Sequence, residues 1–206
     1  MLPLLLPLVM PTLAAVQPPD YGRVLVREQA AVLEAMNAQG RHAEVVESGE
    51  RFQEELLPAA AVEYEVAFAW NALGEGDRAR RHYLRAVELD PGDAASWYDL
   101  GEILLRAQEL DAAADAFGRA TALRPDHWAG PFRLAEIAAR RRQPELFEQH
   151  LRDALRAGFS FRVVLGDANW LGYYRDPALQ DVLRRLVTVY SDERLLEAFE
   201  REGVAP

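Results

Sequence analysis

The chain has 206 residues, half of them hydrophobic, which is enough to bury the core of one domain or of a short row of repeated units. Its 33 acidic residues outnumber the 23 basic ones and give a net charge of −10, so the surface repels phosphate backbones and nucleic acid is a poor general partner. Cysteine is absent, which excludes disulfides, a thiol nucleophile and sulfur-ligated metal.

Residues 1–16 carry no charge and include three prolines. The apolar run Leu2–Met10, followed by small residues, is similar to a short secretory signal with a cleavage point after Ala14 or Ala15. Such a signal begins with a positive charge, and none occurs before Arg23. The segment is also shorter than the roughly 20 residues of a membrane-spanning helix. We expect an exported, periplasmic protein that touches a membrane only through this segment if it is uncleaved; the alternative is a cytoplasmic protein.

Residues 20–58 predict a helical hairpin. Tyr21–Ala38 has the spacing of an amphipathic helix, a turn follows around Gly40, and a second helix ends at Pro58. The apolar positions that predict the first helix are Val24, Leu25, Ala31, Val32, Ala35 and Met36.

The clearest pattern lies in residues 94–127. Trp97 and the leucines three and seven residues further on share one face of a helix. Gly101 removes side-chain bulk where this helix would cross a second one. The second helix ends before Pro125, because the residue before a proline disfavours helical backbone. These residues therefore predict two helices packed closely against each other.

The same residue types return at a spacing of 34. Pro91, Ala86, Tyr83 and Ala79 precede Pro125, Ala120, Phe117 and Ala113 by this interval. With W-Y-D-L-G-E-I-L at 97–104, the layout resembles the tetratricopeptide repeat, whose pattern is W-x2-L-G-x2-Y, A-x3-F, P. The resemblance covers residues 59–159, including a weaker third unit after residue 127. Residues 20–58 are similar to a degenerate copy, since Gly40 lies 34 residues before Gly74.

The resemblance implies an all-α fold, a right-handed α-solenoid of antiparallel helix hairpins. From residue 160 the periodicity changes, with aromatic residues between 170 and 174, a predicted helix over 177–189 and a last helix that ends near Phe199. Similar tails follow the last unit of many bacterial tetratricopeptide proteins. They imply capping helices over residues 160–206, since the end of a stacked array must be covered. The alternative is that the aromatic residues form a contact surface for a partner.

Motifs for catalysis, cofactors or metals are missing from the sequence. There is no H-E-x-x-H and no G-x-S-x-G. The carboxylates fall into helical partnerships such as Glu102 with Arg106 and Glu136 with Arg140. We therefore expect no catalytic residue, no cofactor and no metal ligand. The four histidines, which we expect at surfaces or helix caps, are His42, His82, His127 and His150.

In the family that the repeats resemble, the first helices of the hairpins line a concave groove that receives a peptide or a helix. The resemblance implies a groove with aromatic residues that anchor apolar side chains of a partner. The alternative is that the N-terminal helices or the C-terminal tail cover these residues. The absence of Lys argues against the clamp by which chaperone-binding relatives hold a terminal carboxylate. The predicted groove residues are Tyr64, Phe68, Asn71, Tyr98, Glu102, Leu105, Phe132, Glu136 and Arg140.

The expected function is a non-catalytic scaffold that binds a peptide or protein partner in a bacterial envelope assembly. One alternative is an accessory subunit of an envelope enzyme or secretion machine, in which the partner supplies the chemistry. Another is an enzyme that uses the aromatic region around Trp170 and Asp167 as a small-molecule or glycan pocket.

Overall fold

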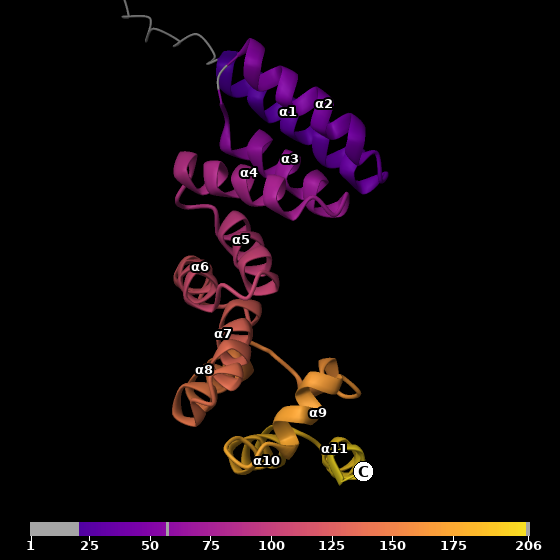
Figure 1. Cartoon of the computed structure of the whole chain (residues 1–206), viewed down its shortest axis with the longest axis vertical. Helices are drawn as coiled ribbons and strands as arrows, with labels where there is room; N and C mark the ends of the chain where they lie inside the picture. The colour runs from indigo at the N-terminus through magenta and orange to yellow at the C-terminus, as the bar shows by residue number, and fades with distance from the viewer. Residues whose placement is uncertain (1–20, 57, 205–206) are drawn as a thin grey trace, which may run out of the picture.

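The computed structural model describes residues 21–56 and 58–204, so the signal-like residues 1–16 lie outside the described part. Figure 1 shows an elongated stack of helices that runs from α1 and α2 at one end to α10 and α11 at the other. The described residues contain α-helices, a short 3-10 helix over Phe161–Val163 and no strand. The α-helices are α1 (Tyr21–Ala38), α2 (His42–Glu55), α3 (Ala60–Ala72), α4 (Gly76–Leu89), α5 (Ala94–Arg106), α6 (Leu110–Leu123), α7 (Ala129–Arg140), α8 (Pro144–Arg156), α9 (Ala168–Arg175), α10 (Gln180–Tyr190) and α11 (Glu193–Val204).

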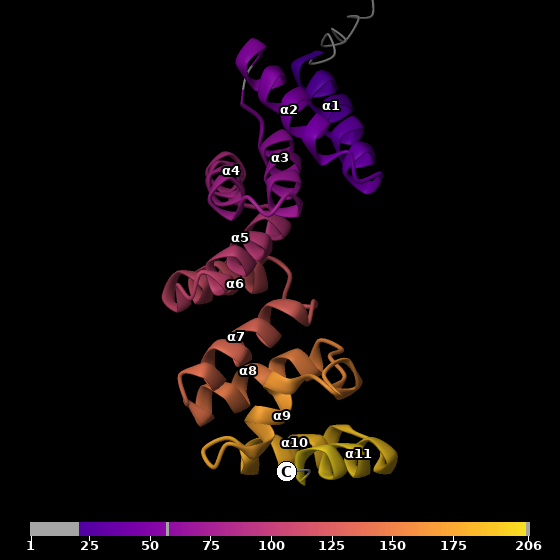
Figure 2. The ribbon, with the colours of Figure 1, turned by 45° about the vertical axis from the view of Figure 1, so that its right-hand side comes forward.

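The first eight helices form four hairpins, in which α1 packs on α2, α3 on α4, α5 on α6 and α7 on α8. In Figure 1 and Figure 2, α3, α5 and α7 follow one another along the long axis, while α4, α6 and α8 lie beside them. The predicted all-α solenoid of antiparallel hairpins is therefore confirmed.

The turn inside each of the four hairpins has one residue in left-handed backbone, and these residues are 34 positions apart. They are Gly40, Gly74, Gln108 and Arg142, with φ of 73°, 81°, 61° and 52°. In each turn the N–H of the next residue donates to a carbonyl five residues back, which closes the end of the first helix. The period read from side chains is thus repeated in the backbone, and it includes the N-terminal hairpin.

The two helices of a hairpin approach closely where one of them lacks a side chain. A Cβ on Gly101 of α5 would lie 2.7 to 2.9 Å from the ring of Phe117, which α6 supplies. Phe117 is fully buried, so its ring fills the space that the glycine leaves. The predicted close crossing of these helices is present. Gly49 of α2 allows a close approach between neighbouring hairpins instead, because its Cβ would lie 2.3 Å from Val66 of α3.

Helix α1 has the predicted bounds, but it does not bury the predicted face. Leu33 is fully buried, whereas Val24, Leu25 and Val32 are 36%, 49% and 52% exposed. The packed face is set by α2 and α3, which both contact α1. A polar residue anchors this face, since the Asn37 amide donates to the Glu65 side chain at 2.8 Å and to its backbone carbonyl at 3.0 Å.

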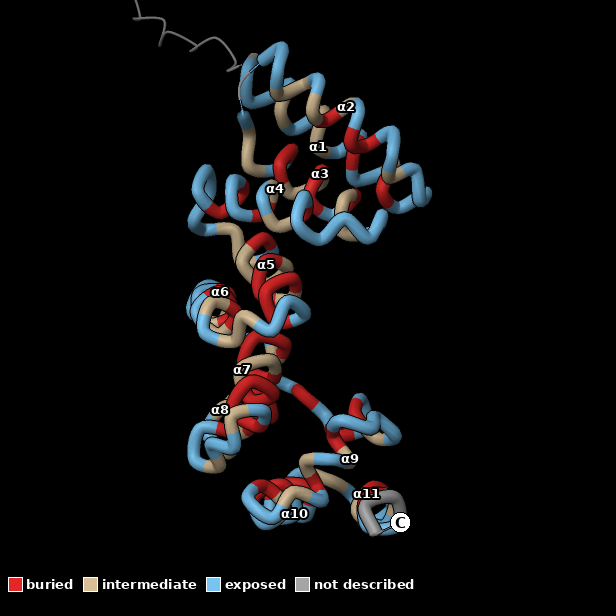
Figure 3. The backbone as a smooth tube through the Cα atoms, viewed as in Figure 1, coloured by how far each residue is buried: buried red, intermediate tan, exposed pale blue. Residues whose placement is uncertain are grey.

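The C-terminal helices pack onto the last hairpin through an aromatic core. Phe132 of α7, Phe147 of α8 and Trp170 of α9 belong to the same buried cluster, which reaches Phe199 in α11. Figure 3 shows the buried residues as a column that passes through α5 and α7. Helix α9 was not predicted, and it begins where the Asp167 carboxylate accepts hydrogen bonds from two N–H groups of its first turn.

Candidate functional site

Two hollows lie along the row of first helices, and two of the predicted groove residues, Tyr64 and Tyr98, line them. The first has a volume of about 840 Å³ and lies between α1, the start of α3 and the start of α5. The second has a volume of about 410 Å³ and lies between α5, the end of α6 and the start of α7. Tyr64 and Ala95 line both, so the hollows adjoin. They form a shallow path from α1 to α7 that is open to solvent.

The second hollow is lined by one carboxylate and several aromatic side chains. Tyr64 donates to Asp99 Oδ2 at 2.9 Å, and the Tyr83 hydroxyl lies 3.5 Å from the same oxygen. Burial raises the pKa of the Asp99 carboxyl, although these two hydrogen bonds act in the opposite direction. The aromatic lining consists of Tyr64, Tyr98, His127 and Trp128.

Neighbouring first helices are joined by hydrogen bonds between residues 35 positions apart. Tyr64 of α3 bonds Asp99 of α5, and Arg133 Nε of α7 donates to the Tyr98 hydroxyl at 3.4 Å. Because these two pairs are themselves 34 residues apart, they occupy equivalent places in successive units. A third bond of the same spacing joins Arg106 to Asn71, at 2.6 Å. The floor of the groove therefore fixes one repeat against the next.

Arg133 is held between two carboxylates. Its guanidinium lies 2.5 Å from Glu102 of α5 and 2.5 Å from Glu136 of its own helix. Burial alone would lower the pKa of Arg133, but the hydrogen bond and the charges of the two glutamates outweigh it and raise the pKa. The predicted pairs of Glu102 with Arg106 and Glu136 with Arg140 were wrong. Both glutamates pair with Arg133 instead, Glu102 from the adjacent helix α5 and Glu136 from within α7.

Three of the predicted groove residues are buried, which corrects the predicted groove. Phe132 is 7% exposed because its ring stacks on Trp170, with centroids 5.0 Å apart and an interplanar angle of 14°. Glu136 is 5% exposed beneath Arg133, and Leu105 is 5% exposed in the core around α5. The alternative that the C-terminal tail covers part of this face is the correct one at Phe132.

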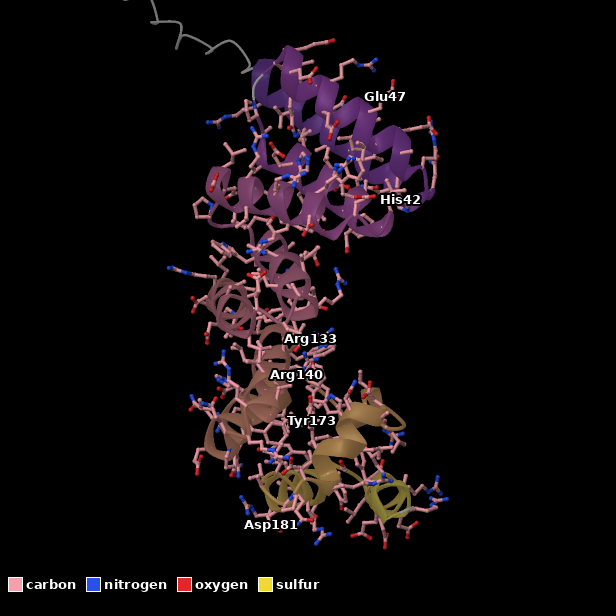
Figure 4. The ribbon with its side chains drawn as sticks, in the orientation of Figure 1. His42, Glu47, Arg133, Arg140, Tyr173 and Asp181 are labelled. Atoms are coloured by element: carbon pink, nitrogen blue, oxygen red, sulfur yellow. The ribbon has the colours of Figure 1, made fainter. Side chains whose placement is uncertain are left out.

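The other six predicted residues remain at least partly accessible. Tyr64 and Tyr98 line the hollows, and Phe68 is 39% exposed. Figure 4 labels Arg133 and Arg140 of α7 and, below them, Tyr173 of α9. The remaining residues are Asn71 and Glu102, which are half-buried, and Arg140, which is exposed.

Asp99, Trp128 and Ala95 line the second hollow and were not predicted. Two of them could have been predicted from the repeat, because Ala95 and Asp99 lie close to Tyr98 on the same helix. The repeat did not indicate Trp128, because this residue precedes α7 and the orientation of its side chain depends on tertiary packing. Its ring stacks on His127 at 6.1 Å and meets the edge of Phe132 at 5.7 Å.

Groups for metal chemistry are not assembled in the described residues, where no cluster of three or more His, Asp or Glu side chains could hold an ion. His82 has a packing role instead, because its Nδ1 lies 2.7 Å from Oε2 of the fully buried Glu63. Among the described helices, none has the length and apolar character needed to cross a membrane.

Antiparallel helix pairs that stack at a 34-residue period, with a groove along their first helices, define a helical repeat protein of the α-solenoid class. The tetratricopeptide repeat family model matches residues 69–126 and 104–158. Residues 69–158 therefore belong to the tetratricopeptide repeat family, and the predicted resemblance is confirmed.

Solved structures of other proteins share this fold at low identity. PilF of Pseudomonas aeruginosa is 16% identical, with a TM-score of 0.64 over 89% of this chain and 92% of its own. MamA is 12% identical, with a TM-score of 0.60 over 84% of this chain and 92% of its own. YrrB, described as a TPR protein with an unusual peptide-binding site, is 17% identical, with a TM-score of 0.60 over 73% of this chain and 76% of its own.

The Protein CTR9 homolog of Arabidopsis thaliana is similar in sequence over part of its length. It is 31% identical over 106 residues, which are 50% of this chain but 9% of that protein. The chain therefore spans only a small part of the length of this relative.

Proposed function

We propose that this chain is a non-catalytic scaffold that holds an extended segment of a protein partner along its first helices. The observation that carries the proposal is the pair of adjoining hollows, which share Tyr64 and Ala95 and extend from α1 of the first hairpin to α7 of the fourth. Tetratricopeptide proteins generally act as interaction scaffolds, and the structural neighbour YrrB is described by its peptide-binding site. A path of this length suits a chain segment better than a compact small molecule.

The shape of the path favours an extended segment. Its floor includes alanines at the starts of α3, α5 and α7, and such small side chains leave room for a backbone to approach. The tyrosines between them offer flat rings to the side chains of the bound segment. Recognition of this kind uses a few aromatic anchors and polar contacts at the rim.

The two residues that the enzyme alternative requires, Trp170 and Asp167, are not available to a ligand. Trp170 is 2% exposed and its ring packs between Phe132 and Phe147, so it cannot stack on a sugar. The Asp167 side chain accepts the hydrogen bonds that cap α9. Both residues thus have structural roles that support a non-catalytic protein.

We also propose that the scaffold works outside the cytoplasm, in an envelope assembly. This rests on the uncharged, signal-like residues 1–16 of the sequence. N-terminal sequencing of the native protein tests it. A mature chain that begins after Ala14 or Ala15 supports export, and an intact Met1 contradicts it.

The groove is tested by blocking it. Ala95 is exposed on the wall of both hollows, so Ala95→Trp fills the path without disturbing the core. Leu84→Trp is the matched control, since Leu84 is 39% exposed on α4, which belongs to the row of second helices. The full chain and both variants are used as bait in the source organism, and the captured proteins are compared by mass spectrometry. We expect partners that Ala95→Trp loses and Leu84→Trp keeps; the reverse pattern would place the binding surface on the second helices.

A further inference from the structure

The second hollow has the chemical features of a pocket for a cation. Asp99 contributes a half-buried carboxylate, and Tyr64, Tyr98 and Trp128 contribute aromatic rings. A positively charged group gains from the negative face of such rings as well as from the carboxylate. The same rings would offer less to an anion, which their faces repel.

The carboxylate is only half satisfied by the protein. Both tyrosine hydroxyls lie within reach of Oδ2 of Asp99, and none of the described residues donates a hydrogen bond to Oδ1. Arg124 also lines this hollow, but it is not among the described groups that act on the Asp99 carboxyl. A charged carboxylate that is partly removed from water is stabilised by a cationic partner, because the attraction is stronger in a low-dielectric site.

Carboxylates outnumber arginines along the two hollows taken together. The carboxylates that line the two hollows are Glu34, Glu65, Asp90, Asp93 and Asp99, and the arginines are Arg23, Arg27 and Arg124. Acidic groups thus predominate, as they do over the chain with its net charge of −10. A path of this sign attracts basic segments and disfavours acidic ones.

The aromatic wall is fixed before any ligand arrives. Tyr98 packs edge-on against Phe117, with ring centroids 5.4 Å apart, and Trp128 is held between His127 and Phe132. Rings that are already oriented lose little conformational entropy on binding, which favours affinity.

We propose that the second hollow binds an arginine or lysine side chain of the partner segment, with its charge directed at Asp99 Oδ1 and its stem between the rings of Tyr98 and Trp128. This inference rests on the proposed function and specifies the chemistry of the bound segment. The partner is therefore a basic, extended stretch of protein.

The test is a nuclear magnetic resonance titration of the 15N-labelled full chain with two tripeptides. One is acetyl-Ala-Arg-Ala-amide, and the other replaces arginine by citrulline, which has nearly the same shape and no charge. We expect the arginine peptide to bind at least about tenfold more tightly, since a hydrogen bond to a charged group contributes more than one between neutral groups. The amides of α5 around Tyr98 and Asp99, and those at the start of α7, should shift on binding. The preference should weaken as salt is added.

Two variants locate the charge that gives this preference. Asp99→Asn keeps an acceptor for the tyrosines and should bring the two tripeptides to within about twofold of each other. Asp115→Asn removes the same charge from an exposed position on α6 and should leave the preference unchanged. Thermal unfolding of both variants shows that they are folded.

The outcomes separate this inference from the proposed function. If both tripeptides bind the hollow equally, or if Asp99→Asn keeps the preference, the cation pocket is wrong while the groove still holds a peptide. If neither tripeptide binds the hollow, the cation pocket is likewise overturned. The scaffold proposal is decided separately, by the comparison of Ala95→Trp with Leu84→Trp.

Discussion

Tyr98 and Phe132 occupy the same place in successive repeats, 34 residues apart, yet only one of them is accessible. Tyr98 lines the second hollow, whereas Phe132 is 7% exposed under Trp170. We call the part of the groove along α3 and α5 the open half. The part along α7, against which Trp170 of α9 packs, is the closed half. The repeat decides which side of the stack a residue faces. The elements outside the repeat decide whether a partner can reach it.

Asp99 follows Tyr98 in the sequence and Arg133 follows Phe132, and these two residues also differ between the open and the closed half. Asp99 in the open half leaves one carboxylate oxygen without a described hydrogen-bond donor, whereas Arg133 in the closed half is paired with Glu102 and Glu136. The open half thus keeps a charge for a ligand, and the closed half uses its charges to fix α5 against α7. Four ways to test or sharpen this comparison follow.

The largest expected effect concerns the closed half. Phe132→Ala should lower the free energy of unfolding by about 3–5 kcal/mol, because it opens a cavity beneath Trp170. Phe68→Ala, in the open half, is the control and should change it by less than about 1 kcal/mol, since Phe68 is 39% exposed. Urea unfolding measures both. Equal losses would mean that the two halves are equally packed.

The second test concerns the crossing of α5 with α6 in the open half. Gly101→Ala should destabilise the protein by about 1–3 kcal/mol, because the new Cβ meets the buried Phe117 ring. Gly118→Ala on α6 should instead stabilise it by about 0.5–1 kcal/mol, since nothing lies within 4 Å and alanine favours a helix. Thermal unfolding should therefore show shifts of opposite sign. A stabilising Gly101→Ala would show that Phe117 can move away.

The third test uses the 34-residue period of the backbone. Gln108 has φ of 61° in the α5–α6 turn, where the first two hairpins have glycine. Gln108→Gly should stabilise the protein by about 1 kcal/mol, because left-handed backbone costs other residues about 1–2 kcal/mol. Gly74→Ala, at the equivalent turn, should destabilise it for the same reason, and unfolding midpoints compare the two. A loss of stability in Gln108→Gly would contradict this explanation.

The smallest effect concerns Asp99 and depends on pH. Burial raises the pKa of this carboxyl in the folded protein, so its charged form is disfavoured there and lowers stability at neutral pH. Asp99→Asn should therefore unfold at a slightly higher temperature than the parent chain at pH 7. The difference should shrink as the pH falls towards and below the ordinary pKa of aspartate. If the difference in unfolding temperature grew on acidification, the pKa of Asp99 would be lowered by folding and not raised.

Much of the fold could be predicted because it depends on short-range periodicity. The bounds of α1 were predicted correctly, and Gly101 marked the crossing with Phe117, since both follow from spacing along the chain. The buried face of α1 was not predicted, because Leu33 and Asn37 are buried by helices that follow later in the chain. Apolar spacing indicates a helix more reliably than it indicates which face is covered.

The site was harder to predict because accessibility is a tertiary property. Tyr64 and Tyr98 could be identified from their places in the repeat, and they line the hollows. Phe132 has the same place and is covered by α9, a helix for which the sequence contained no repeat signal. Arg133 pairs across helices with Glu102, and such contacts cannot be read from spacing within one helix.

Site-specific photo-cross-linking tests the central claim, that a partner enters the open half of the groove. A photoreactive phenylalanine is placed at Ala95, which lines both hollows, or at Leu84 on α4, and the full chain is irradiated with its captured partners. We predict cross-links from position 95 to a basic segment of a partner and none from position 84. Cross-links from position 84 alone would contradict the account.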